Sequence, residues 1–491
     1  MTCSPTSTGP SAGPAGSESL SEPGVVVCVD FGSTFTKAAL VDLAAGRIAA
    51  SASHPTTLPS PEDGGDVLDG FDACLAVLVA RDARARDAAV LACSSAGGGL
   101  RIAVVGNEEL VTSEAGRRVA LSSGGKVVHV GHGGLDPTSY AALTAAEPDV
   151  LLLVGGTDGG NAEVLEADAE LLAARGWPRP VVVAGNVESQ GRIAALFEES
   201  GTPHVPADNV VPCIGVLAPE SARAAIREMF LAHVIGGKHL SERPDFTAMV
   251  RGATPDVVLT GVELLARGLG PDRPGAGDVV VVDVGGATTD VHSVVEIDPE
   301  EAGLSREVVA VTPVTRTVEG DLGMRWSAPS TVEAAGLADL DGSLDLVQEA
   351  DRRRRDPGLL PADEAGRAVD EAIARAAVDL ALRRHAGRSR VVLSPDGRVV
   401  ERSGKDLREV DLLVASGGVL RNGAPGVVRR VVGPSTGDVE GGWQLPRAPR
   451  VVVDRDYVLA AVGLLADAHP EAAYALARGL VESAGEDGSG E

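Results

Sequence analysis

The segment VVCVDFGSTFTK (residues 26–37) joins an apolar run to an aspartate and a turn of small, hydroxyl-bearing residues. A similar segment, VVVVDVGGATTD, occupies residues 279–290. The two segments align Asp30 with Asp283, Gly32 with Gly285, and Thr36 with Thr289. A second apolar run follows each copy, at 38–41 and 291–295, as the returning strand of a hairpin would. The repeat predicts two related halves that each open with a strand, a tight turn and a returning strand.

Both turns have the composition of a phosphate-binding loop. Glycine, serine and threonine let backbone N–H groups and hydroxyls approach a phosphate without obstruction by a Cβ atom. An aspartate at the end of a buried strand can hold Mg²⁺ through water molecules, since this ion keeps several waters when bound. Two such turns facing each other would clamp the phosphates of one nucleotide, with the charge neutralised by the metal and Lys37. The alternative is that each Asp-x-Gly merely ends a strand, but the matched pair favours the clamp.

A third segment, LLVASGGVL at residues 412–420, follows the second turn along the chain. A strand that runs into Ser-Gly-Gly and then a helix allows a flat ring to approach the backbone closely. Its position makes Gly417 and Gly418 candidates for contacting the adenine and ribose of a nucleotide. An ordinary strand-to-helix turn remains the alternative interpretation.

Composition excludes several classes of protein. The chain has 491 residues, enough for about three domains or two larger ones. Its net charge is −27 and aromatic residues make up 2% of it, which argues against a nucleic-acid partner and against base stacking. Five scattered cysteines predict reduced thiols rather than disulfides or a zinc site. No basic leader and no run of about 18 apolar residues is present, so we expect a cytoplasmic protein without a membrane partner.

Short β-branched runs alternate with Ala/Leu-rich amphipathic stretches, a pattern that predicts an α/β fold with mostly parallel sheets. We expect a disordered tail at 1–23, a first lobe at 24–275 with an inserted α/β segment, a second lobe at 276–470 and an acidic tail at 471–491. The expected strands are 25–29, 37–41, 89–92, 126–130, 150–154, 181–184, 279–283 and 412–415. The expected helices are 67–81, 162–175, 219–235, 362–384 and 457–466.

The order of two phosphate turns and a Gly-Gly turn resembles the ATPase superfamily of actin, Hsp70 chaperones and sugar kinases. The step from Asp30 to Lys37 is similar to the actin version of the first turn, in which the lysine contacts phosphate. The segments CSSAGGGL (93–100), VGGTDGGN (154–161) and AGN (184–186) resemble the glutamate mutase L family, accessory proteins of cobalamin-dependent methylaspartate mutase. The likeness covers about residues 24–470.

These resemblances imply a two-lobed, actin/Hsp70/sugar-kinase-like ATPase fold with a duplicated core and a nucleotide cleft between the lobes. They imply ATP and Mg²⁺ as cofactors, slow ATP hydrolysis, and reactivation or assembly of an adenosylcobalamin-dependent mutase, whose subunits would be the partners; a homo-oligomer is compatible. A small-molecule kinase and a non-hydrolysing scaffold are the alternatives. Asp30 and Asp283 would hold hydrated Mg²⁺ and serve catalysis. The expected phosphate contacts are Gly32, Ser33, Thr34, Thr36, Lys37, Gly285, Gly286, Thr288 and Thr289.

Four further motifs have two interpretations each. The glycine-rich loop 155–161 is either an anion site at a helix start or a turn with Asn161 as the helix cap. The segment 94–99 is expected to line the cleft, since no nucleophile elbow is present. His129 and His132 have a spacing that can hold a metal on a helix, but their Val-rich flanks predict a strand and a turn that separate the two rings. We therefore expect structural or exposed histidines. The run Arg352–Arg355 favours a solvated helix face over a docking site for an acidic partner.

Overall fold

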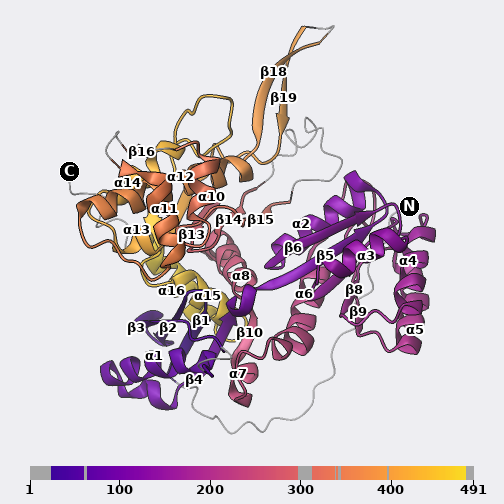
Figure 1. Ribbon diagram of the computed structural model, residues 1–491, viewed down its shortest axis with the longest axis horizontal. Helices are drawn as coiled ribbons and strands as arrows, with labels where there is room; N and C mark the ends of the chain where they lie inside the picture. The colour runs from indigo at the N-terminus through magenta and orange to yellow at the C-terminus, as the bar shows by residue number, and fades with distance from the viewer. Residues whose placement is uncertain are drawn as a thin grey trace.

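A computed structural model describes residues 24–59, 64–296, 312–337, 339–340, 344–394 and 397–482. Three five-stranded sheets organise these residues, with helices packed on and between them (Figure 1). The expected N-terminal tail at 1–23 lies outside the described residues.

The two halves have the same strand topology. The first sheet has the order β10-β4-β1-β2-β3, and the second has the order β15-β14-β13-β20-β21. In both sheets the first strand pairs antiparallel with the next one along the chain, and parallel with the strand on its other side. The strands are β1 (Val25–Phe31), β2 (Phe35–Asp42), β3 (Arg47–Pro55), β4 (Ala89–Ser94), β10 (Val250–Ala253), β13 (Val279–Val284), β14 (Thr289–Val294), β15 (Val314–Glu319), β20 (Leu412–Gly417) and β21 (Arg450–Val453). The internal repeat therefore predicted a true structural duplication.

Alternating side chains of β1 and β13 divide the apolar core into layers. Val27 and Val29 of β1 face α1 (Val67–Arg81), while Val280 and Val282 of β13 face α12 (Glu364–His385). The opposite faces of both strands enter a shared core with α8 (Thr254–Arg267), α15 (Val458–Leu465) and α16 (Pro470–Glu482). These three helices lie between the lobes (Figure 1). Burial on both faces explains why β1 and β13 are continuous apolar runs.

An inserted domain follows β4. Its parallel sheet has the order β6-β5-β7-β8-β9, the doubly wound order in which the first strand lies between the second and the third. The strands are β5 (Leu100–Gly106), β6 (Gly125–His132), β7 (Val150–Leu153), β8 (Val181–Val183) and β9 (His204–Pro206). The segment Ala96–Gly98, a short 3₁₀ turn, leads from β4 into this domain.

The inserted domain contacts the second lobe through α2 (Glu114–Ser122), which packs on β15. Its other helices are α3 (Pro137–Ala145), α4 (Glu163–Ala174), α5 (Gln190–Ser200) and α6 (Glu220–Met229). The remaining helices of the lobes are α7 (Pro244–Met249), α10 (Ala328–Ala334), α11 (Leu346–Arg355), α13 (Gly418–Asn422) and α14 (Val427–Val431). Short two-stranded ribbons complete the fold: β11 (Gly268–Gly270) with β12 (Arg273–Pro274), β16 (Asp339–Leu340) with β17 (Leu344–Asp345), and β18 (Arg388–Ser394) with β19 (Gly397–Ser403).

One expected boundary needs correction. The chain does not become an acidic tail at residue 471, because α16 continues to Glu482. Its Leu476 and Leu480 are buried in the core shared by the lobes. The amphipathic pattern of this helix is hidden by its polar ends. Of the expected tail, residues 483–491 lie outside the described residues.

Candidate nucleotide site

The two predicted phosphate turns lie against each other. A Cβ atom built on Gly286 would lie 3.3 Å from Oγ1 of Thr34, so the second turn meets the first across the gap between the lobes. The Thr34 hydroxyl is buried and has no hydrogen-bond partner. A buried hydroxyl without a partner is costly, and a phosphate oxygen at this place would satisfy it.

Both turns have the same internal geometry. The N–H of Gly32 donates to the carbonyl of Phe35 at 3.1 Å, and the N–H of Gly285 donates to the carbonyl of Thr288 at 2.8 Å. A Cβ atom at Gly32 would lie 2.6 Å from the Phe35 oxygen, and one at Gly285 would lie 2.9 Å from the Thr288 oxygen. The tight turn itself therefore requires glycine at both positions, whatever ligand it holds.

Two of the predicted phosphate ligands are committed elsewhere. Thr36 and Thr289 are fully buried. The Thr36 hydroxyl lies 3.3 Å from that of Thr56, and the Thr289 hydroxyl donates to the carbonyl of Leu322 at 3.0 Å. These two threonines stabilise the strands next to the turns, and the expectation that they contact phosphate is wrong. Ser33, Thr34, Gly286 and Thr288 stay partly accessible in the turns.

Asp30, Lys37 and Asp283 form the charged centre of the site. Asp30 and Lys37 lie opposite each other on β1 and β2, and Nζ of Lys37 donates to Oδ2 of Asp30 at 3.2 Å. The other oxygen of Asp30 accepts from the Thr254 hydroxyl at 2.7 Å. Burial acts to lower the pKa of Lys37, but the carboxylates of Asp30 and Asp283 raise it above its ordinary value. Lys37 therefore stays charged beside the turns.

Asp283 of the second lobe faces the same lysine. Burial raises the pKa of Asp283, Lys37 opposes that shift, and Asp290 adds to it. Among the described residues no salt bridge to Asp283 is formed, whereas Asp30 is already paired. A half-buried carboxylate without an ion-pair partner suits a hydrated Mg²⁺, so the residues fit the metal that the sequence implies. No cluster of three or more metal-ligating side chains occurs in the described chain.

Asp290, the last residue of the second repeated segment, is paired with an arginine. Nε and Nη2 of Arg316 lie 3.0 and 2.5 Å from its Oδ1, and Thr288 donates to its Oδ2. Arg316 is buried and also donates to the carbonyls of Leu121 and Gly125 in the inserted domain. Asp290 is therefore positioned to link the turn to the inserted domain rather than to accept a proton.

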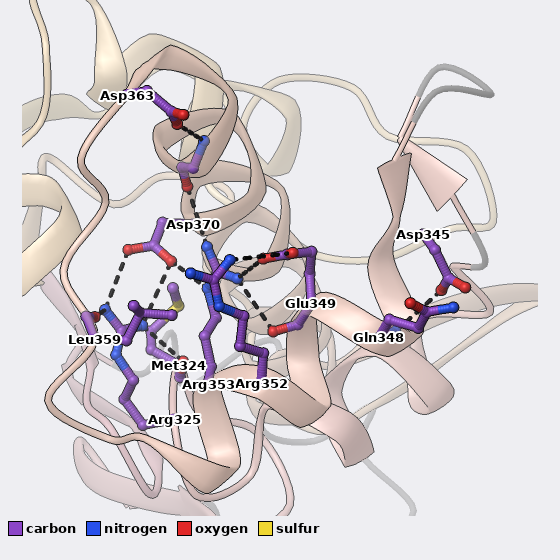
Figure 2. A network of polar contacts seen from close by, with 11 residues as sticks. Met324, Arg325, Asp345, Gln348, Glu349, Arg352, Arg353, Leu359, Asp363 and Asp370 are labelled. Carbon is purple, nitrogen blue, oxygen red and sulfur yellow. Dashed lines mark hydrogen bonds and ion pairs between the residues drawn. The ribbon is translucent and has the colours of Figure 1, made fainter.

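The second turn is supported by an ion network that includes part of the arginine run (Figure 2). Backbone N–H groups of Met324 and Arg325 donate to the carbonyls of Gly285 and Gly286 at 3.0 and 2.8 Å. Arg325 pairs with Asp370 at 3.2 Å, and Asp370 accepts from Nε of Arg353 at 2.6 Å. Arg353 is buried, so the expectation of a solvated helix face is wrong at this position, although Arg352 is exposed.

The Gly-Gly turn contributes in two different ways. Gly417 has a φ of +123°, and a Cβ atom there would lie 2.5 Å from the carbonyl oxygen of Val284. It is required for the close contact between β20 and β13. Gly418 has no atom within 4 Å of a built Cβ and begins α13, so it is free to line a ligand.

Sequence reasoning missed an aromatic stack at the same place. The Tyr457 ring lies between two cations, with Nζ of Lys37 4.0 Å and Cζ of Arg421 3.7 Å from its centroid. Tyr457 adopts a φ of +57° directly before α15, a strained conformation for a bulky residue. A cavity of about 330 Å³ is lined by Asp30, Lys37, Arg421 and Tyr457, together with parts of β2, β3 and α15. The cations from the two lobes thus meet beside the turns.

Asp454 lies just before α15, and its pKa is shifted. Its carboxylate accepts from the N–H groups of Val458 and Leu459 at 2.7 and 3.1 Å. Burial raises its pKa to about 6, although these two N–H groups oppose the shift. The folded state therefore holds the proton more tightly than the unfolded chain, where an aspartate has a pKa of about 3.9.

Replacing Asp454 by asparagine is expected to alter the pH dependence of stability. The contribution of the raised pKa is fully present below the unfolded pKa and is lost as pH rises through about 6. Wild type should gain stability relative to Asp454→Asn when pH falls from 7 to 5, as measured by urea unfolding. An equal difference between the two proteins at both pH values would contradict this assignment.

The remaining motifs are structural. The loop 155–161 is held by Asn186, Asn209 and its own Asp158, and Asn161 accepts from the N–H of Glu163 at 2.8 Å. His129 and His132 lie on β6, and His132 has only a 3.9 Å approach to Glu109. The segment 94–99 is next to the first turn, since the N–H of Ser95 donates to the carbonyl of Phe31. Four of the cysteines lie in the described chain, and all four are free thiols.

Strand order, duplication and facing turns define a protein with the actin/Hsp70/sugar-kinase-like ATPase fold. A protein-family model described as "MutL protein" matches residues 26–480. The "Protein MutL" of Clostridium tetanomorphum is 35% identical over 454 residues, which cover 91% of this chain and 96% of that protein. The chain belongs to the MutL protein family, the glutamate mutase L family of the sequence resemblance.

Solved structures with related architecture were also found. Nucleotide-free acetone carboxylase is 15% identical with a TM-score of 0.39, covering 95% of this chain and 77% of its own. The activator of 2-hydroxyisocaproyl-CoA dehydratase from Clostridium difficile, with bound ADPNP, is 9% identical with a TM-score of 0.29, covering 94% and 97%. The strand order described above defines the fold. No helix in the described part of the chain is long and apolar enough to span a membrane.

Proposed function

We propose that this protein binds ATP with Mg²⁺ and uses its hydrolysis to reactivate or assemble an adenosylcobalamin-dependent mutase, such as glutamate (methylaspartate) mutase. The observation that carries the proposal is the approach of Thr34 to Gly286, which brings two matched turns together. Membership of the MutL family supports the accessory role. The free thiols fit a reducing cytoplasm, where the mutase subunits would be its partners.

Each candidate residue then has a defined role. Asp283, with Asp30, would hold hydrated Mg²⁺, which neutralises phosphate charge during hydrolysis. Lys37 and the Thr34 hydroxyl would contact phosphate from the first lobe, and the turn at 285–288 would contact it from the second. Gly418 would line the nucleoside. Contacts from both lobes to one phosphate group favour the closed state, because only that state makes all of them.

A polar connection could carry this closure to the inserted domain. A continuous chain of hydrogen bonds runs from Thr288 in the second turn through Asp290 and Arg316 to the carbonyl of Leu121 in α2. Arg316 is nearly inaccessible to solvent, so its five donors depend on these partners. A shift of the turn on nucleotide binding would change how α2 packs on β15.

The test measures phosphate release from Mg·ATP with and without the adenosylcobalamin-dependent mutase of the same organism. We expect slow hydrolysis that rises when the mutase is added, and recovery of mutase that carries damaged cobalamin. Arg316→Met should keep ATP binding but lose most of the stimulation. Phosphorylation of a small metabolite with no effect of the mutase would instead identify a kinase. Absence of ATP binding would leave a scaffold.

A further inference from the structure

The loops at one edge of the inserted domain carry acidic residues and no lysine or arginine. Its five strands are parallel, so the loops that follow them meet at one edge, which we call the carboxyl edge: residues 107–113, 133–136, 154–162, 184–189 and 207–219. These loops contain no lysine or arginine. They contain six acidic residues: Glu108, Glu109, Asp136, Asp158, Glu188 and Asp208. The opposite ends of the strands carry both signs of charge, with the cations Arg101, Lys126, Arg175 and Arg179 and the acids Glu147 and Asp149.

The carboxyl edge also exposes large apolar side chains. Ile214 is 79% exposed and Leu110 is 68% exposed, which places both among the most exposed large apolar residues of the described chain. Val216 is exposed in the same loop as Ile214, and Val187 is exposed in the loop after the neighbouring strand β8. Val187 follows β8, Ile214 lies in the loop after the neighbouring β9, and Leu110 follows β5 in the same sheet. Such a group of exposed apolar side chains is typical of an interaction surface.

The edge is poorly suited to a small anionic ligand. The glycine-rich loop is tied to the two neighbouring loops, because Asp158 accepts from the N–H of Val187 and from the side chain of Asn209. Asn186 and Asn209 also occupy the carbonyls of Gly160 and Gly156. Six carboxylates without an opposing cation would repel phosphate or carboxylate groups. The interpretation of this loop as an anion site is therefore not supported.

We propose that the carboxyl edge of the inserted domain is the docking surface for the partner protein, a partner that presents an apolar segment flanked by lysine or arginine. Charge complementarity identifies this chemistry, since the loops supply acidic and apolar groups only. The inference depends on the proposed function for the identity of the partner, the mutase. Docking at the carboxyl edge would be coupled to the nucleotide site through the opposite end of the inserted domain. At that end Arg316 donates to the carbonyls of Leu121 and Gly125.

The experiment measures mutase binding to immobilised full-length protein and mutase-stimulated ATP hydrolysis. The test variant is Leu110→Asp/Ile214→Asp, which changes two exposed side chains and so should fold normally. The control is Leu360→Asp, at a side chain of the second lobe that is 72% exposed. We expect the test variant to weaken binding about tenfold or more and to lose stimulation, with ATP binding unchanged, while the control behaves like wild type.

A second variant tests the charges. Glu109→Lys/Glu188→Lys should weaken mutase binding and reduce its dependence on salt. Wild-type binding that both variants retain would overturn the docking surface and leave the proposed function standing. No mutase binding by the wild type would overturn the proposed function and the docking surface with it. A wild-type dimer that Leu110→Asp/Ile214→Asp converts to a monomer would show that a second copy occupies the edge instead.

Discussion

Asp283→Asn is expected to fold as the wild type does and to lose Mg²⁺-dependent ATP turnover by about 100-fold or more. Asparagine keeps the shape of the side chain but removes the negative charge that would hold the hydrated ion. Burial already raises the pKa of Asp283, so removing its charge relieves a desolvation cost and should not destabilise the fold. Phosphate release and thermal unfolding measure the two effects separately.

Asp278→Asn is the matched control for that variant. Asp278 directly precedes β13, at the end of the strand opposite to the second turn, and it too has a pKa raised by burial. It accepts the N–H of Glu296, which an asparagine oxygen can also do. Its turnover should equal that of wild type. If Asp283→Asn retained full turnover as well, Asp283 would not be part of the site.

Gly417→Ala is expected to destabilise the protein by about 2–4 kcal/mol. Alanine tolerates a φ of +123° poorly, and its Cβ atom would lie 2.5 Å from the carbonyl oxygen of Val284. The parallel pairing of β20 with β13 would have to open to relieve this contact. Urea unfolding monitored by circular dichroism gives the change in the free energy of unfolding.

Substitution of the neighbouring Gly418 distinguishes an effect on ATP binding from an effect on stability. Gly418→Ala adds a methyl group with no atom within 4 Å, so the free energy of unfolding should change by about 0.5 kcal/mol or less. Because Gly418 is the residue free to line a nucleoside, its substitution should weaken ATP binding more than it weakens the fold. Equal stability losses in the two variants would contradict the different roles assigned to them.

The duplicated core was predictable because its signal is local. A fully buried strand, a tight glycine turn and a returning strand occupy about a dozen consecutive residues, and the two copies resemble each other directly. The expected helix at 67–81 is confirmed by α1, whose start is marked by the cap Asp66 and whose end is marked by Arg81. The capping residue and the hydrophobic periodicity are local features that predict this helix.

Other parts of the fold depend on contacts that no local pattern reveals. Strand β5 was not among the predicted strands, although Leu100–Gly106 is apolar, because the glycines before it indicated only a loop. The helix α8 was missed for a similar reason, since its Thr-Pro start resembles a turn.

The residues that position the site could not be predicted, because their partners lie far from them in the sequence. Arg353 is in a run of four arginines that indicates a solvated surface, yet it pairs with Asp370, 17 positions away, beneath the second turn. Tyr457 meets Lys37 across 420 positions. The first pair depends on the packing of α11 against α12 within the second lobe, and the second depends on how the two lobes assemble, so both follow from the tertiary fold. The charged centre could be proposed from sequence, whereas the residues that position it could not.

Calorimetric titration of Mg·ATP into the wild type and into Gly286→Val tests the central claim most directly. Valine at this position would fill the gap in which Thr34 and Gly286 face each other. We expect saturable binding of one ATP per chain by the wild type, and none by Gly286→Val at the same concentrations. Wild type that binds no ATP, or a valine variant that binds it equally well, would contradict a nucleotide site between the two turns.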